Sequence, residues 1–259
     1  GPMLLRIEDT DDKRKVEGSE ELIIKSLKFF GIEFDEGVSL EGEKGIYGPY
    51  RQSDRREIYQ TAAKYLTEKG FTYPSFVSEE EMAQIREEQE KAGVNTGYYG
   101  KWAKDRELTF EEIKDNLDAG KPWTLRLKSG GDPEVSMKFK DGIRGEINVR
   151  QNNLDVVILK QNGIPTYHFA HVVDDHFMRV SDVVRGEEWL STLPIHLELF
   201  FVMGWRRPNY NHTAHLMKVE DGKKRKLSKR KDPELSLEYY MKDGYFPEAV
   251  TEYLMTLMN

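Results

Sequence analysis

A change of pattern near residues 71 and 163 constrains the fold of this chain more than any other feature. Residues 4–7 form a short apolar run that ends in acids, and the next 60 residues carry two helical patterns. Residues 71–163 then combine charged helices with strand-like runs, after which the earlier alternation of helix and strand resumes. We therefore predict an α/β domain (residues 4–70 and 164–217) interrupted by an inserted α+β module (residues 71–163), with a final segment at residues 218–259.

Helix boundaries follow from capping signals. Ser19 opens the first predicted helix and Gly31 ends it, while Asp54 and Glu57 form a predicted capping box for a second helix that stops at Gly70. The inward faces of these two helices are predicted to carry Leu22, Ile23, Leu27, Phe30, Ile58, Ala62, Tyr65 and Leu66.

The inserted module shows two further caps and several strands. Ser78 with Glu81 and Thr109 with Glu112 predict the starts of two charged helices, and Gly120 stops the second. Strands are predicted at residues 123–128, 135–139, 147–149 and 156–159, with turns at Gly130-Gly131 and Asp141-Gly142. Beyond the module we predict a helix after Tyr167, a strand at 182–184, a helix at 189–203 and helical residues 235–258 interrupted by Gly244 and Pro247.

Composition bounds the chemistry and the location. The 259 residues include no cysteine, which excludes disulfides and thiolate metal sites and is compatible with the cytoplasm. No stretch approaches the length of a membrane span, and the start carries no signal-peptide pattern. The net charge is −7, so a nucleic-acid partner would need a local basic face.

One such face is predicted at residues 223–230. Lys226-Leu227-Ser228-Lys229-Arg230 follows Lys223-Lys224-Arg225, with Gly222 before the run and Asp232-Pro233 after it. We interpret this as a mobile cationic loop that closes on phosphate. A basic loop that only contacts solvent is the alternative.

Residues 226–230 resemble the lysine-serine-lysine signature of class I aminoacyl-tRNA synthetases in its glutamyl variant. Five more segments resemble glutamyl-tRNA synthetases in the same order, namely residues 5–11, 48–53, 165–167, 172–176 and 185–189. The resemblance implies a Rossmann-like nucleotide-binding domain, an inserted acceptor-stem-binding domain and a C-terminal helical segment. It also implies a monomer that joins L-glutamate to tRNA-Glu, using ATP with Mg²⁺ as its counter-ion.

The resemblance assigns roles in two steps, formation of glutamyl-adenylate and transfer to a ribose hydroxyl of the tRNA. Lys229 first, and Lys226 and Ser228 next, would stabilise charge on the leaving pyrophosphate. The ATP site would comprise Lys229, Glu188, Trp189 and Leu216.

Substrate recognition would depend on Arg185. It follows the predicted strand 182–184, and a guanidinium suits a side-chain carboxylate. An ion pair with Glu187 or Glu188 is the alternative for this arginine. By resemblance, the remaining substrate-binding residues are Glu8 for the ammonium group, Tyr167 and His171. Residues 8–11 could instead cap a helix, and Trp189 could belong to the core.

Metal sites are not predicted. His168, His171 and His176, with nearby acids, could suit a metal-dependent hydrolase, but the family resemblance accounts for the segment better. Some family members bind a structural zinc in the insertion; the matching positions, Ser75, Val77, Trp102 and Lys104, include no thiolate. We predict no structural zinc.

The family's first signature, a strand and turn followed by a histidine-containing helix start, should precede Leu4 and is absent from this sequence. We therefore expect a catalytic-core fragment with impaired activity and unpaired strand edges. A glutaminyl-type synthetase, a tRNA-modifying paralogue and a non-catalytic RNA-binding module are the alternatives. The first is disfavoured because an amide substrate would not need Arg185.

Overall fold

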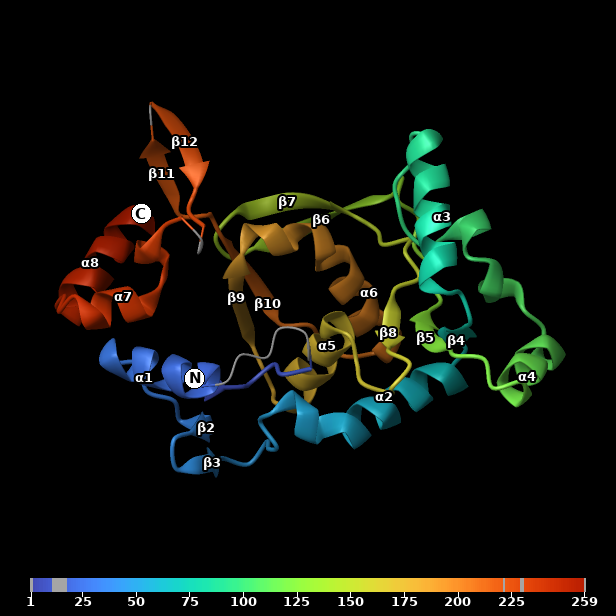
Figure 1. The fold of residues 1–259 in the computed structure, drawn as a ribbon, viewed down its shortest axis with the longest axis horizontal. Coiled ribbons are helices and arrows are strands. Elements are labelled where there is room, and N and C mark those ends of the chain that lie inside the picture. Colours follow the sequence, from blue (N-terminus) through green and yellow to red (C-terminus); the bar gives the residue numbers. More distant parts are fainter. Residues whose placement is uncertain (1, 11–17, 221, 229–230, 259) are drawn as a thin grey trace. The chain divides into compact units, whose positions relative to one another are not determined.

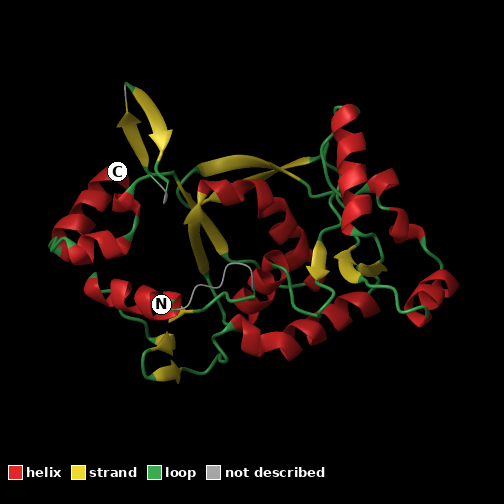
Figure 2. Cartoon of the chain, viewed as in Figure 1, coloured by secondary structure: helices red, strands yellow, loops and turns green. Residues whose placement is uncertain are grey.

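The computed structural model describes residues 2–10, 18–220, 222–228 and 231–258, and the side chains up to residue 257. The chain divides into two compact units. The first comprises residues 1–54 and 214–259, and the second comprises residues 55–213 (Figure 1). The protein is mixed α/β, with helices and several small sheets (Figure 2). The predicted division at residues 70 and 163 falls inside the second unit and stays a prediction.

The described residues of the first unit form a small sheet, a hairpin and three α-helices. Its elements are β1 (Leu4–Leu5), α1 (Ser19–Phe29), β2 (Glu36–Ser39), β3 (Gly42–Lys44), β11 (Met217–Glu220), β12 (Lys223–Lys226), α7 (Leu237–Lys242) and α8 (Pro247–Met258). The sheet has the order β1-β2-β3, parallel and then antiparallel, and β11 pairs with β12 in a hairpin. α1 packs on α7, where the rings of Phe30 and Tyr240 meet edge-on at 6.5 Å.

The second unit, whose residues are all described, has five α-helices, and three of them form its core. Its helices are α2 (Arg56–Glu68), α3 (Glu79–Lys91), α4 (Phe110–Asp118), α5 (Tyr167–Phe177) and α6 (Leu193–Met203). Its strands are β4 (Thr72–Ser75), β5 (Thr124–Leu127), β6 (Ser136–Asp141), β7 (Gly145–Arg150), β8 (Val157–Leu159), β9 (Asp182–Gly186) and β10 (Asn209–Thr213). The core packs α2, α5 and α6 against β5 and β8, with Tyr59, Leu66, Leu127, Ile158, Phe169, Val172 and Leu199 fully buried.

Two sheets of this unit are antiparallel and one is parallel. β4, β5 and β8 form an antiparallel sheet, and β6 and β7 form an antiparallel hairpin. β9 and β10 pair in parallel, side by side in Figure 1. Among the described residues, neither β9 nor β1 pairs on its second edge. Both strands are therefore edge strands of their sheets.

A buried ion pair fixes α5, the helix that carries Tyr167 and His171. Arg55 Nε donates to Asp174 Oδ1 at 2.7 Å, and the Tyr59 hydroxyl donates to Asp174 Oδ2 at 2.8 Å. Both members of the pair are almost fully buried. Removing one member of such a pair typically costs about 3–5 kcal/mol, because the other charge is left buried without a partner. The orientation of α5 therefore depends on an interaction across 119 residues of sequence.

The local caps of the insertion are confirmed. Ser78 with Glu81 and Thr109 with Glu112 form complete capping boxes, and Gly120 follows α4 with a φ of 68°. The predicted box at Asp54 is wrong. That residue lies in a 3-10 turn, Gln52–Arg55, and α2 begins at Arg56 without a side-chain cap. At the start of this turn, the Ile7 N–H donates to the Tyr50 carbonyl and the Gln52 N–H donates to the Ile7 carbonyl, and the 3-10 turn forms in place of the predicted cap.

The predicted apolar faces are confirmed in part. Ala62 and Leu66 of α2 are buried, but Tyr65 is 42% exposed, and Leu22 and Ile23 of α1 are also largely exposed. Spacing alone therefore predicts which residues share a face, but not which part of that face another element covers.

The predicted strands of the insertion are all present, shifted by one or two residues. Asp141-Gly142 begins the turn of the β6–β7 hairpin, as expected. Gly130-Gly131 does not join paired strands, because β5 pairs with β4 and β8 and not with β6. The predicted helix 189–203 begins as a 3-10 turn, Glu187–Thr192, before α6. The terminal helices are interrupted at Gly244 and begin again at Pro247, as predicted.

Residues 223–226, predicted as part of a loop, form the strand β12. None of the helices in the described ranges is long and apolar enough to span a membrane.

Candidate substrate-binding site and basic hairpin

Parallel pairing of β9 and β10 places Arg185 beside His212. The two residues are register partners, and Tyr210 pairs with Val183 two positions earlier. In β10, alternate residues Tyr210 and His212 are fully buried, because side chains on a strand alternate between its two faces. The predicted strand is confirmed, but it is longer than expected: β9 extends from Asp182 to Gly186, so Arg185 lies within the strand, one residue before its end.

Three hydrogen bonds hold the Arg185 guanidinium. Nε donates to His212 Nε2 at 3.0 Å, one terminal nitrogen contacts His196 Nδ1 at 3.0 Å, and the other donates to the Trp189 carbonyl at 3.5 Å. The guanidinium also lies over the Tyr210 ring, 4.7 Å from its centre. A guanidinium has five N–H groups. One N–H on each terminal nitrogen therefore stays available, which is the arrangement that binds a carboxylate with two hydrogen bonds.

Aromatic rings surround this arginine. The Tyr167 ring lies 4.6 Å from that of Trp189 and stacks on His171 at 5.8 Å. His171 Nε2 lies 3.2 Å from the Tyr210 hydroxyl. We call Tyr167, His168, His171, Arg185, Trp189, His196, Tyr210 and His212 the ring cluster. Three of the predicted substrate residues, Tyr167, His171 and Arg185, thus come together with Trp189.

The bonding partners of the histidines fix their tautomers. Because a guanidinium donates and does not accept, His196 Nδ1 and His212 Nε2 must both be acceptors without hydrogen. His196 therefore carries its hydrogen on Nε2 and donates it to His168 Nδ1, 3.0 Å away. Burial, with smaller contributions from His171 and Arg185, lowers the pKa of His196 far below its usual value. Burial also lowers the pKa of His168, so the arginine keeps neutral neighbours.

His212 is bonded on its other side to Asp141. Its Nδ1 lies 2.6 Å from Asp141 Oδ2, and both side chains are fully buried. Burial lowers the pKa of His212, against the opposing effect of this hydrogen bond. Burial opposes the ionisation of Asp141, but bonds from the backbone of Arg144 and from His212 hold the pKa of its carboxyl below the usual range.

A glycine allows the turn that carries Asp141 to reach β10. The Gly142 N–H donates to the Tyr210 carbonyl at 2.9 Å. A Cβ at residue 142 would lie 1.8 Å from Asn211 Oδ1, so any other residue would require the Asn211 side chain to move.

The alternative ion pairs of Arg185 are not formed. Glu187 pairs with Arg144, and Arg185 has no carboxylate partner among the described residues. Glu188, a predicted ATP contact, lies over Gly186, where a side chain would meet its carboxylate. No carboxylate of the described residues therefore balances the Arg185 charge.

The three histidines considered for a metal do not converge. His168 and His171 belong to the ring cluster, whereas His176 stacks on Trp205 at 3.9 Å. Within the described ranges, no three His, Asp or Glu side chains are grouped as metal ligands. At the position considered for zinc, the Ser75 hydroxyl donates to Asp105 at 2.8 Å, and no thiolate is present to hold the metal.

Glu8 and its neighbours lie in the first unit. Arg6 donates to Glu8 at 3.1 Å, and Asp9 accepts from the Ser53 N–H at 2.8 Å and from the Ser53 hydroxyl at 2.7 Å. Asp9 thus caps a short turn, as the alternative interpretation allowed, while Glu8 stays exposed. The two segments similar to synthetases, residues 5–10 and 48–53, are joined by backbone bonds of Ile7.

The basic hairpin, β11 with β12 and the residues up to Ser228, is anchored by Asp232. Arg225 donates to both oxygens of Asp232, at 2.7 and 2.8 Å, and the Ser228 N–H donates at 2.9 Å. The bonds from Arg225 and Ser228 hold the pKa of Asp232 far below its usual value. Lys226 is exposed and donates to His215 at 3.3 Å. Lys229 lies outside the described residues.

Leu216, predicted near the adenine, ends the segment before β11. Its carbonyl accepts from the Leu227 N–H at 3.0 Å, which brings it beside the start of the lysine signature. Lys226, Ser228 and Leu216 are thus grouped in the first unit.

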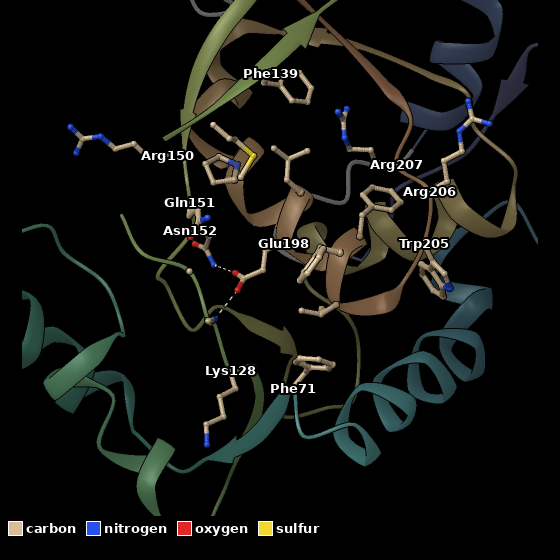
Figure 3. A pocket seen from close by; sticks show the side chains of 18 of the residues that line it. Phe71, Lys128, Phe139, Arg150, Gln151, Asn152, Glu198, Trp205, Arg206 and Arg207 are labelled. Atoms are coloured by element: carbon tan, nitrogen blue, oxygen red, sulfur yellow. Dashed lines mark hydrogen bonds between the residues drawn. The ribbon is translucent and has the colours of Figure 1, made fainter. Parts of the chain in front are cut away.

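A separate pocket of about 750 Å³ lies in the second unit beside α6 (Figure 3). Its apolar lining includes Phe71, Phe139 and Phe201, and its rim carries Lys128, Lys138, Arg150, Arg206 and Arg207. The Glu198 carboxylate accepts from Asn152 at 2.6 Å and from the Gly130 N–H at 2.9 Å, marked in Figure 3. Of the five cations, Lys138 alone pairs with a carboxylate among the described residues.

The family profile described as tRNA synthetases class I (E and Q), catalytic domain, matches residues 1–258. The chain belongs to this family. The chain is 62% identical over 259 residues to a glutamate–tRNA ligase of Acetivibrio thermocellus, covering 100% of this chain and 47% of that protein. A glutamate–tRNA ligase of Clostridium beijerinckii is 51% identical over 260 residues, with the same coverage.

A solved structure is also similar to this class I synthetase chain. The crystal structure of a glutamate tRNA ligase from Elizabethkingia meningosepticum in complex with its amino acid gives a TM-score of 0.84 at 36% identity. The match covers 97% of this chain and 53% of that one. The chain therefore spans about half the length of the curated relatives it matches.

Three residues of the ring cluster, His196, Tyr210 and His212, were not predicted from sequence. Asp141, which bonds to His212, was not predicted as a site residue either. The sequence carried one usable signal: Tyr210 and His212 alternate in a short run that forms a strand. Nothing local could have identified Asp141, because it meets His212 across 71 residues.

Proposed function

We propose that the chain is the catalytic part of a glutamate–tRNA ligase. The observation that carries this proposal is the Arg185 guanidinium, held by two neutral histidines and the Trp189 carbonyl, with one N–H left on each terminal nitrogen. Such a group favours the side-chain carboxylate of glutamate over the amide of glutamine. The names of the relatives agree with glutamate and do not favour a glutaminyl enzyme.

In the proposed reaction, a glutamate α-carboxylate oxygen attacks the α-phosphorus of ATP. The bond to the bridging oxygen breaks, and pyrophosphate leaves with its electron pair, giving glutamyl-adenylate. A ribose hydroxyl at the tRNA 3′ end then attacks the activated carbonyl, loses its proton, and AMP leaves. Positioning and cations are the main requirements of such a reaction. Mg²⁺ would accompany ATP as its counter-ion.

The residues divide between the two ends of this chemistry. Arg185, Tyr167 and His171 would bind glutamate, with Glu8 on the ammonium group. Lys229, Lys226 and Ser228 would act on the phosphates, and Glu188, Trp189 and Leu216 would contact ATP. A Rossmann-like domain with an acceptor-stem-binding insertion at residues 71–163 is the finer fold that we propose. The rim cations Lys128 and Arg150 belong to that range and would suit RNA phosphates.

Binding of L-glutamate tests the proposal directly. Isothermal titration of the chain with L-glutamate and with L-glutamine should show a clear preference for the acid. Pyrophosphate exchange with tRNA, in a protein of the relatives' full length, should require glutamate. A preference for glutamine, or exchange independent of the amino acid, would contradict the proposal.

A further inference from the structure

Arg185 is oriented by a hydrogen-bonded series that begins at Asp141 and passes through His212. Asp141 Oδ2 lies 2.6 Å from His212 Nδ1, and His212 Nε2 accepts from Arg185 Nε at 3.0 Å. The direction of every bond is determined, because a guanidinium only donates and an ionised carboxylate only accepts. His212 can satisfy both partners only as the neutral tautomer with hydrogen on Nδ1.

We propose that Asp141 and His212 are positioning residues for Arg185 and thereby set the preference for a side-chain carboxylate. This inference rests on the proposed function for the identity of the ligand. Asp141 selects the tautomer of His212, and His212 in turn fixes the plane of the guanidinium. The guanidinium of Arg185 is then fixed before the ligand arrives, which reduces the entropy lost on binding.

The surroundings of Asp141 make its charge the controlling feature. Oδ1 accepts three backbone N–H groups, from Ile143 at 3.0 Å, Arg144 at 3.0 Å and His212 at 3.2 Å. In an Asp141→Asn variant, the amide oxygen must keep this side, because an NH₂ group would oppose three donors. The NH₂ group therefore faces His212 Nδ1 and forces hydrogen onto Nε2. That hydrogen then opposes the Nε–H of Arg185.

Two measurements on the whole chain test this series. Long-range ¹⁵N–¹H spectra of the histidine rings should show hydrogen on Nδ1 of His212 in the wild type and on Nε2 in Asp141→Asn. Titration calorimetry should show that Asp141→Asn weakens L-glutamate binding by roughly 10- to 100-fold, the range for one hydrogen bond to a charged group. Binding of L-glutamine should change much less.

A matched control and a rescue separate positioning from mere stability. Asp132→Asn changes an exposed carboxylate whose oxygen accepts from the Glu134 N–H at 2.9 Å, and it should alter neither measurement. In the double variant Asp141→Asn with His212→Gln, the glutamine oxygen can accept from Arg185, because an amide oxygen is an acceptor whatever residue 141 is. That variant should recover most of the lost affinity.

The outcomes are decisive in each case. A wild-type His212 with hydrogen on Nε2 would overturn the inference, and so would an Asp141→Asn variant that keeps its tautomer or its glutamate affinity. A double variant no better than Asp141→Asn would overturn it as well. If the wild type binds no glutamate, the proposed function fails in this chain. In that case, the His212 tautomer in Asp141→Asn is the only measurement that tests whether Asp141 and His212 position Arg185.

Discussion

The ring cluster and the basic hairpin handle charge in opposite ways. Arg185 is bonded to two buried, neutral histidines, His196 and His212, and among the described residues it has no carboxylate partner. Arg225 of the hairpin is paired with Asp232, and Lys226 beside it is exposed. The first arrangement keeps a cation ready for a fixed ligand, whereas the second uses ion pairs to shape an exposed segment. A side-chain reader needs the former, and a segment that closes on phosphate needs the latter.

The sharpest test of this contrast is Arg185→Ala. Removing this partly buried cation should weaken L-glutamate binding on the order of 1000-fold, since losing one partner of a charge pair commonly costs several kcal/mol. Titration calorimetry measures the change, and Arg150→Ala, an exposed cation of the same unit, is the control. Unchanged binding would exclude Arg185 as the side-chain reader.

Lys229→Ala should have the second largest effect, and on a different quantity. In a protein of the relatives' full length, it should lower the rate of adenylation roughly 100-fold, because its charge is needed most as pyrophosphate departs. The Michaelis constant for glutamate should stay nearly constant. Pyrophosphate exchange separates the two, with Lys64→Ala, an exposed lysine of α2, as the control. An effect on the Michaelis constant alone would contradict the role.

Asp232→Asn should loosen the basic hairpin without affecting the ring cluster. It weakens the two bonds from Arg225 and the bond from Ser228, so hydrogen exchange of residues 217–228 should accelerate, on the order of tenfold. Glutamate binding should be unchanged. Mass spectrometry of deuterium uptake checks the first statement and calorimetry the second. If exchange stays slow, Asp232 does not anchor the hairpin.

Acid should affect the two regions in separate pH ranges. Burial lowers the pKa of His168, His196 and His212 below the ordinary value of 6.5, so the unfolded chain binds more protons below that pH. Folding stability should therefore be independent of these groups above pH 6.5 and fall below it, by up to about 1.4 kcal/mol per pH unit for each histidine.

The pKa of Asp232 is lowered from 3.8, so its contribution should be complete above that pH and lost as the pH falls further. Urea unfolding between pH 8 and 5 should reveal the histidine effect in both the wild type and Asp232→Asn. Stability that rises on acidification across this range would contradict neutral histidines in the folded chain.

Sequence and structure contributed differently to these conclusions. The sequence by itself determined the caps at Ser78 and Thr109, the presence of the strand at Arg185 and the strands of the insertion. In each case the decisive interactions join residues a few positions apart or follow a period-two pattern. It also predicted correctly that the chain belongs with the glutamyl-type synthetases, because six motifs occur in one order.

Only the tertiary structure decided what surrounds Arg185. His212 reaches it through strand pairing 27 residues away, and Asp141 reaches His212 across 71 residues. Local propensity contains no information on such pairs, and it also failed at Asp54, which lies in a 3-10 turn before α2. The sequence thus predicted Arg185, Tyr167 and His171 as site residues, while long-range hydrogen bonds and packing decided the partners of Arg185 and the tautomers of His196 and His212.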